Sequence, residues 1–197
     1  MSTAWTKHGA VTDGVWKFNR KAQLEILPNS DRMCCMYKLW PTPICPLCHS
    51  AWGTISHILS SCPVLSANAY TYRHNMVCDV MRNAAVNNGW QVASYGTELP
   101  PSIVKPALLT NLRNTRPDIV LYNDFSQHVA NIVLVEVTVT FDNDRNIKAA
   151  RRFKSSIYQP LLEAIKLSHP LESVSIAVAL VVVGARGIIH EFWILNR

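Results

Sequence analysis

Two acidic segments followed by a lysine-bearing helix hold the residues of this chain that are best suited to chemistry. Asp118 lies near the start of the stretch RPDIVLY, and Glu136 lies inside a second stretch, NIVLVEVTVT. Lys154 follows on a segment with helical signals, with Tyr158 one turn beyond it. Two carboxylates on neighbouring strands form a hard oxygen site suited to Mg²⁺ or Mn²⁺. A nearby lysine can orient or deprotonate an attacking water. Together these groups are typical of a metal-dependent phosphodiesterase and favour a nuclease.

A sheet is needed to bring the two acids together. We expect strands over residues 116–122 and 131–140, with Glu136 on the same face as Leu134 and Thr138 because side chains alternate along a strand. Valines fill the opposite face, and apolar residues on both faces indicate a central strand. A carboxylate buried there is costly unless a metal or a cation pairs with it. A partly exposed glutamate in an edge strand is the alternative.

Further segments complete an expected α/β core. Their predicted ranges are a helix over about 67–85, a short strand over 91–94, a long helix over about 144–167 and a strand over 173–183. The last apolar stretch, 188–195, fits a strand or a helix. The longest apolar run, 174–183, falls well below the ~20 residues that span a bilayer, so we expect no membrane segment.

Four residues of a compact cysteine-rich segment have the spacing of metal ligands. Cys45 and Cys48 are separated by two residues, His57 follows after eight more, and Cys62 follows after another four. Two thiolates from a turn, with a histidine and a cysteine about one helical turn apart, can close a tetrahedral zinc site. Four protein ligands leave no position for water, so this zinc would be structural. His49 is a possible substitute ligand.

The charge of the chain favours an anionic partner. Its formal net charge is +6 and its pI is about 9.1, although many domains are mildly basic without binding nucleic acid. A carboxylate site that approaches a polyanion benefits from cations around it. Such cations crowd the proposed acidic site: Lys105, Arg113, Arg116, Arg145, Lys148, Arg151, Arg152 and Lys154. We therefore expect a nucleic acid as the partner.

The chain divides into three expected parts. Residues 1–40 read as a connector or leader, residues 41–65 as the zinc-binding segment, and residues 66–197 as the α/β domain. The first residues contain no apolar region typical of a secretory signal, so we expect an intracellular protein. An apolar content of 49% is ample for a packed core.

The order of these motifs resembles a known family. The motifs are Cys45-x-x-Cys48 with His57 and Cys62, then Arg73-His74-Asn75, then Arg116-Pro117-Asp118, then Glu136-Val-Thr-Val, then Lys154 with Tyr158. This succession, over roughly residues 24–165, resembles the C-terminal region of site-specific non-LTR retrotransposons that carry a restriction-like endonuclease. The ribosomal-DNA-inserting elements of insects are familiar members.

The resemblance implies a CCHC zinc knuckle followed by an endonuclease of the PD-(D/E)xK type, with a mixed sheet flanked by helices. Asp118 and Glu136 would bind the catalytic Mg²⁺ or Mn²⁺. Lys154 would be the catalytic lysine, moved to the helix, because Thr138 stands where the strand lysine of the general pattern would be. Tyr158 would share its helical face. Lys154 as one cation of a solvated stripe, and Tyr158 as an aromatic at the edge of the core, are the alternatives.

The resemblance also implies double-stranded DNA as the partner and indicates how it would be held. Arg73 and His74 resemble a basic pair that could grip phosphate, and polar residues on an exposed helix face are the alternative. The full set of expected DNA contacts is Arg73, His74, Arg116, Lys148 and Arg151. The element's RNA and a second copy of the chain on DNA are further candidate partners, in the nucleus.

Two rival functions stay open at the level of sequence. Nothing in the chain resembles a reverse transcriptase, so we expect target-site nicking by the tail of a larger element, a truncated copy or a domesticated gene. One rival is a zinc-containing nucleic-acid-binding module without catalysis. The other is a structural zinc protein that binds other proteins.

Overall fold

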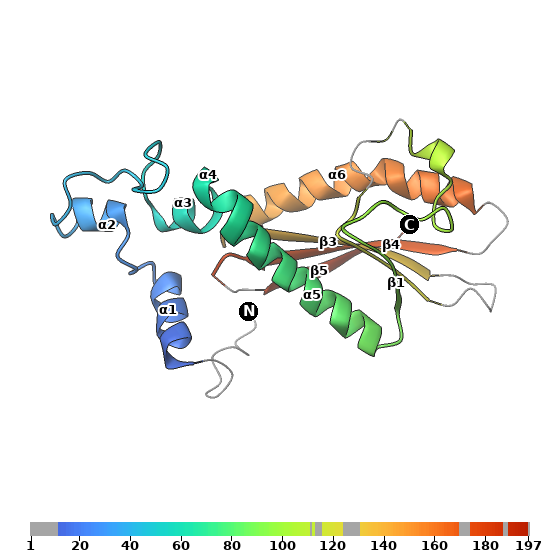
Figure 1. The fold of residues 1–197 in the computed structure, drawn as a ribbon, viewed down its shortest axis with the longest axis horizontal. Coiled ribbons are helices and arrows are strands. Elements are labelled where there is room, and N and C mark those ends of the chain that lie inside the picture. The colour runs from blue at the N-terminus through green and yellow to red at the C-terminus, as the bar shows by residue number, and fades with distance from the viewer. Residues whose placement is uncertain are drawn as a thin grey trace. The chain divides into compact units, whose positions relative to one another are not determined.

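A sheet flanked by helices organises the chain in the computed structural model, which describes residues 12–110, 112, 116–123, 131–169, 174–186 and 189–196. Within these residues the sheet has five strands in the order β1-β2-β3-β4-β5 (Figure 1). Their bounds are β1 Gln91–Tyr95, β2 Ile119–Tyr122, β3 Asn131–Thr140, β4 Ser175–Gly184 and β5 Ile189–Asn196. The expected strand over 131–140 is confirmed, and the undecided last stretch is a strand.

The helices fall close to their expected ranges. Their bounds are α1 Asp13–Gln23, α2 Ser30–Cys35, α3 Ile55–Ser60, α4 Pro63–Leu65, the π-helical η2 Ser66–Tyr70, α5 Thr71–Asn87, the 3₁₀-helical η3 Pro106–Leu108 and α6 Asp144–Ser168. Helix α5 ends just before Gly89, whose φ of 82° lies in the left-handed region that glycine adopts readily. Among the described helices, none is long and apolar enough to cross a membrane.

The register of the central strands decides which residues lie opposite one another. Strands β1, β2 and β3 are antiparallel neighbours, and Ile119 pairs with Val135. Continuing that register by one residue sets Asp118 opposite Glu136. Strands β3 and β4 are neighbours joined through α6, the kind of crossover that parallel strands require, so the sheet is mixed. The expected mixed sheet flanked by helices is therefore confirmed at this level.

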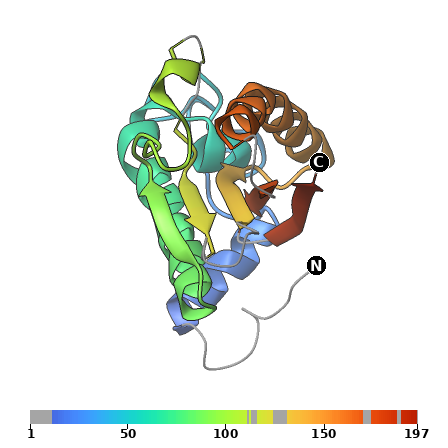
Figure 2. The same ribbon diagram turned by 90° about the vertical axis from the view of Figure 1, so that its right-hand side faces the viewer.

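Helix α6 covers one face of the sheet, and most of α5 lies on the other (Figures 1 and 2). The side chain of Asn143 accepts a hydrogen bond from the Asn146 N–H at 2.8 Å, so it caps the first turn of α6. Asp144 in the first turn and Lys166 in the last complement the helix dipole.

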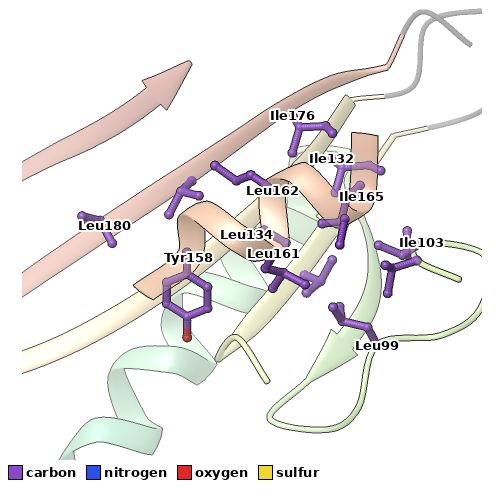
Figure 3. Close-up of a cluster of buried hydrophobic side chains, with 14 residues drawn as sticks. Leu99, Ile103, Ile132, Leu134, Tyr158, Leu161, Leu162, Ile165, Ile176 and Leu180 are labelled. Atoms are coloured by element: carbon purple, nitrogen blue, oxygen red, sulfur yellow. The ribbon is translucent and has the colours of Figure 1, made fainter. Parts of the chain in front are cut away.

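The core beneath α6 follows from its sequence pattern. Apolar residues recur at helical spacing at positions 158, 161, 162 and 165, so they form one face. They pack on alternate residues of β3 and β4 (Figure 3), in a cluster that includes Ile132, Leu134, Tyr158, Leu161, Leu162, Ile165, Ile176, Val178 and Leu180. Each fully buried aliphatic side chain of this kind contributes about 1.5–3 kcal/mol.

The chain groups into two compact units. The first spans Met1–Arg73, Val139–Asn146 and Val183–His190, and the second spans His74–Thr138, Ile147–Val182 and Glu191–Arg197. Residues 1–40, predicted to be a connector, include α1 and α2. In α1, Ala22 is buried with Ile55 and Phe141, all within the first unit.

One arginine ties distant segments of the first unit together. The Arg186 guanidinium donates to the Asp142 carboxylate at 3.1 Å and to the Glu25 carboxylate at 3.1 Å. It also lies over the Phe141 ring, 4.7 Å from its centroid. The side chain of Asp142 is 1% exposed, so this contact supplies a buried carboxylate with a cation.

Candidate functional site

A pocket of about 540 Å³ in the second unit gathers the predicted catalytic residues. The residue just before β2 and strand β3 supply the acids, and α6 supplies the lysine and the tyrosine. The lining residues are Arg116, Asp118, Glu136, Phe153, Lys154, Ile157 and Tyr158. The four side chains predicted to act in catalysis, which are separated by up to 40 positions in the sequence, therefore lie around one space.

Glu136 is buried and both of its carboxylate oxygens have donors from α6. Its residue exposure is 4%. Lys154 Nζ donates to Oε1, and Tyr158 Oη donates to Oε2 at 2.5 Å. Residues four apart in a helix lie on the same face, which is why one helix can supply both donors. These contacts explain how a carboxylate is tolerated in a central strand.

Tyr158 belongs to the core and to the pocket at the same time. Its ring packs in the apolar cluster under α6, while its hydroxyl points away from the other labelled side chains (Figure 3). Burial raises the pKa of Tyr158 far above its ordinary value, and the hydrogen bond to Glu136 raises it further. The phenol is therefore protonated and acts as a hydrogen-bond donor to Glu136.

Asp118 is held by the neighbouring strand and by a histidine. Its Oδ2 atom accepts a hydrogen bond from the Val137 N–H at 2.8 Å and lies 3.2 Å from His74 Nε2. The hydrogen bond with Asp118, followed by a contact with Cys78, raises the pKa of His74 to about 11. His74, predicted to contact phosphate, thus lies against the acid at the pocket.

Arg73, the other member of the predicted phosphate-binding pair, contacts the protein itself. Its Nη2 atom donates to the Leu59 carbonyl at 2.8 Å, and its guanidinium lies over the Tyr70 ring, 5.3 Å from the centroid. Burial lowers the pKa of Arg73. Within the first unit this arginine therefore stabilises the end of α3. A contact between Arg73 and DNA stays a prediction.

The other predicted DNA contacts are exposed where the structure describes them. Arg116 donates to Glu98 at 2.5 Å, with 61% of its side chain exposed. Lys148 is exposed on α6. Arg151 lies within α6, but its side chain is outside the described part of the chain, as is Arg113 entirely. Further exposed cations are Lys105, Arg145 and Arg152.

The four predicted zinc ligands form one cluster in the first unit. Their ligand atoms, from Cys45, Cys48, His57 and Cys62, all lie within 4.8 Å of one another. A tetrahedral zinc ion with bonds of about 2.0–2.3 Å needs ligand atoms roughly 3.3–3.8 Å apart. The Cys48 Sγ to His57 Nε2 distance of 3.3 Å already has that value. This cluster can hold zinc.

Local hydrogen bonds place these ligands. The Cys45 N–H donates to the Ala51 carbonyl at 2.7 Å, which closes the turn that carries the first two cysteines. The Thr54 side chain accepts from the His57 N–H at 3.1 Å and so caps α3, on which His57 lies. His49, the possible substitute, is exposed and is not part of the cluster.

The protonation of one cysteine favours metal binding. Hydrogen bonds from the side chain and then the backbone of Ser50 lower the pKa of Cys48 to about 6. The thiolate is the form that ligates metal, so Cys48 is prepared for that role. Burial raises the pKa of Cys62, which a bound cation would offset.

The pairing of His74 with Asp118 is the main feature that the sequence did not predict. The two residues are 44 positions apart, on α5 and just before β2, and no local pattern links them. With Cys78 they form the second group in the described part of the chain whose ligand atoms lie within 4.8 Å of one another.

No protein-family model matches the chain, and no curated protein matches it. Two carboxylates, a protonated phenol and a lysine line one pocket, and carboxylate oxygens are the ligand type that hard cations prefer.

Proposed function

We propose that this chain is a metal-dependent DNA endonuclease of the PD-(D/E)xK type, derived from a non-LTR retrotransposon and stabilised by a zinc knuckle. One observation carries the proposal: Asp118 and Glu136 from adjacent strands line the same pocket as Lys154 and Tyr158 from α6. The order of motifs along the chain, from the knuckle to Lys154, supports it.

Each residue of the pocket would have a separate role in cleavage. A divalent ion bound by Asp118 and Glu136 would supply Lewis-acid activation of water and stabilise charge on the phosphate. Lys154, which reaches the pocket from α6, would orient that water or neutralise developing charge. Tyr158 would hold the Glu136 carboxylate in place through its hydroxyl. The expected products carry 5′-phosphate and 3′-hydroxyl ends.

Exposed cations of the second unit would bring DNA to the pocket. Arg116 lines it, and Lys148 and Arg152 lie exposed on the helix that supplies Lys154. Binding through such residues depends on phosphate charge, so it should weaken steeply as salt rises. The proposed location is the nucleus, and RNA of the element and a second copy of the chain are proposed additional partners.

Nicking of supercoiled plasmid tests the proposal. We expect the zinc-loaded chain to relax plasmid in Mg²⁺ or Mn²⁺ and not in excess EDTA. Lys154→Ala should abolish nicking while DNA binding persists in a gel-shift assay. Lys166→Ala is the matched control, because it removes an exposed lysine from the same helix outside the pocket and outside the expected DNA contacts, and it should retain nicking. No cleavage by the wild type in either metal would contradict the proposal.

A second candidate is a zinc-containing nucleic-acid-binding module without catalysis. It is favoured by one observation: both oxygens of Glu136 already have protein donors, as in a purely structural ion pair. In that case DNA binding survives substitution of Asp118, and the wild type cuts nothing with any divalent ion.

A further inference from the structure

Three ligand-type atoms converge beside the acidic pocket. His74 Nε2 lies 3.2 Å from Asp118 Oδ2 and 3.3 Å from the Val137 carbonyl oxygen. A single ring nitrogen thus faces two acceptors, although it carries at most one proton. Ligands at right angles around a metal with bonds of about 2.1–2.2 Å lie roughly 3 Å apart. The spacing of these atoms is therefore the spacing of adjacent ligands around one ion.

Proline at position 117 leaves the Val137 carbonyl available for this role. The register that pairs Ile119 with Val135 sets Pro117 opposite Val137. Proline has no N–H, so it cannot donate to the Val137 carbonyl as another residue of a strand could. The adjacent Val137 N–H is bonded to Asp118 Oδ2 at 2.8 Å, which fixes this carboxylate beside the carbonyl.

The other nitrogen of His74 is held in the manner of a metal ligand. Nδ1 lies 3.3 Å from Asn75 Oδ1, an atom that only accepts, and 3.7 Å from Cys78 Sγ. Cys78 is buried, with 3% of its surface exposed, and packs against the ring. Without metal, the hydrogen bond to Asp118 favours a proton on Nε2 as well. A cation bound at Asp118 would displace that proton, and with Nδ1 still protonated the Nε2 lone pair then faces Asp118 and Val137.

From these contacts we propose that His74 Nε2 and the Val137 carbonyl oxygen join Asp118 as ligands of the active-site metal. The inference rests on the proposed function in assuming a metal at Asp118, and it names the class of that metal. Mg²⁺ is bound in proteins mainly by oxygen, whereas an imidazole ligand favours a first-row transition ion. The site therefore takes Mn²⁺ more tightly than Mg²⁺.

Binding of metal alone, in the absence of DNA, tests this ligand set. The zinc-loaded chain is titrated with Mn²⁺ while the electron paramagnetic resonance signal of free Mn²⁺ is followed, and Mg²⁺ affinity is measured by competition. The wild type should bind Mn²⁺ at least about tenfold more tightly than Mg²⁺. His74→Ala should weaken Mn²⁺ binding by about tenfold or more and change Mg²⁺ binding less than about threefold.

Two further variants separate a ligand from a residue that only positions Asp118. His74→Gln keeps an amide donor for Asp118 but lacks the imidazole, so it should bind Mn²⁺ as weakly as His74→Ala. Recovery of wild-type Mn²⁺ affinity in His74→Gln would overturn the proposal. His49→Asn removes an exposed imidazole at a left-handed position (φ 53°) that asparagine tolerates, and it should leave both affinities unchanged. Zinc content and near-ultraviolet circular dichroism report the fold of each variant.

Failure of this inference is distinguishable from failure of the nuclease proposal. Equal Mn²⁺ affinity in the wild type and His74→Ala, with plasmid nicking intact, would remove His74 from the ligand set and leave the nuclease standing. Tight Mn²⁺ binding that depends on His74, without any nicking, would support the ligand set and contradict the nuclease.

Discussion

The cysteine cluster and the acidic pocket are built in opposite ways. The cluster takes its four ligands from one short segment, residues 45–62, and the turn and the helix cap that place them are local. The pocket takes its side chains from two strands and a helix, with contacts that join residues 18, 19 and 44 positions apart. Local chemistry defines the first site, whereas strand register and helix packing define the second.

The two sites should depend on metal to different degrees. Few large apolar side chains are buried in the described part of the cysteine-rich segment, where Leu47 and Trp52 are exposed. The pocket lies against a large apolar core that includes Leu134 and Ile165. We expect zinc to hold the first site together, and we expect the second to keep its shape without its ion.

The largest effect should come from breaking the cluster. Cys45→Ser removes a fully buried ligand, so the chain should lose one zinc ion and unfold locally over residues 41–65, at a cost of several kcal/mol. Elemental analysis and hydrogen exchange measure both changes. Cys35→Ser, at an exposed cysteine outside the cluster, is the control and should keep its zinc. Equal zinc in Cys45→Ser and the wild type would refute the site.

The second largest effect should be a loss of nicking rate without loss of the fold. Asp118→Asn should reduce nicking roughly a thousandfold, because several kcal/mol of stabilisation from the metal are lost at about 1.4 kcal/mol per tenfold in rate. Its unfolding temperature and zinc content should stay close to those of the wild type. Local unfolding of Asp118→Asn, of the kind expected for Cys45→Ser, would show that the pocket depends on its polar groups for stability. It would contradict the expectation that the pocket keeps its shape without its ion.

A substitution in the core tests what supports the pocket. Leu134→Ala, at a residue with 0% exposure, should lower the free energy of unfolding by about 2–5 kcal/mol through lost transfer energy and a cavity. Urea denaturation measures this change. Leu167→Ala is the matched control, because it truncates a leucine that is 64% exposed. It should change the free energy of unfolding by less than about 0.5 kcal/mol.

Removing one hydroxyl should have a smaller effect. Tyr158→Phe keeps the ring in the core and leaves Glu136 Oε2 without its donor, so stability should fall by about 1–3 kcal/mol. Nicking should fall about 10–100-fold, because Glu136 is then less well oriented. Urea denaturation and plasmid nicking measure the two changes. Unchanged nicking would assign this hydrogen bond to stability alone.

The smallest effect is expected at the rim of the pocket. Arg116→Ala breaks an exposed ion pair with Glu98, which is worth less than about 1 kcal/mol. If Arg116 contacts phosphate, the salt dependence of DNA binding should become shallower by about one unit of slope. Fluorescence anisotropy over a range of salt concentrations measures it, and an unchanged slope would exclude the contact.

Much of the fold follows from local patterns. Strand β3 was predictable because an apolar run long enough to be buried on both faces has few alternatives, and α6 because its apolar face repeats at helical spacing. The zinc ligands were predictable because a tetrahedral site limits their spacing in a short segment. The meeting of Glu136 with Lys154 and Tyr158 was expected from the resemblance, which groups the acid with the lysine-bearing helix.

Contacts between distant segments were not predictable in this way. No local pattern in the sequence indicates that the Asp142 carboxylate accepts a hydrogen bond from Arg186, 44 positions away. Arg73 looked like a contact for DNA, but it donates to the Leu59 carbonyl. A single sequence indicates the chemistry that each side chain can perform. Which residue it contacts depends on how the helices and strands pack.

The arginine at position 186 has a consequence for synthesis on the ribosome. The unit that carries the cysteine cluster contains three stretches of the chain, and Arg186 joins Glu25 to Asp142 across 161 and 44 positions. Such long-range closure is slow and can take place only after Arg186 has left the exit tunnel. The segment around Glu25 therefore waits for a residue made 161 positions later before it reaches its final contacts, and it stays accessible to chaperones during that interval.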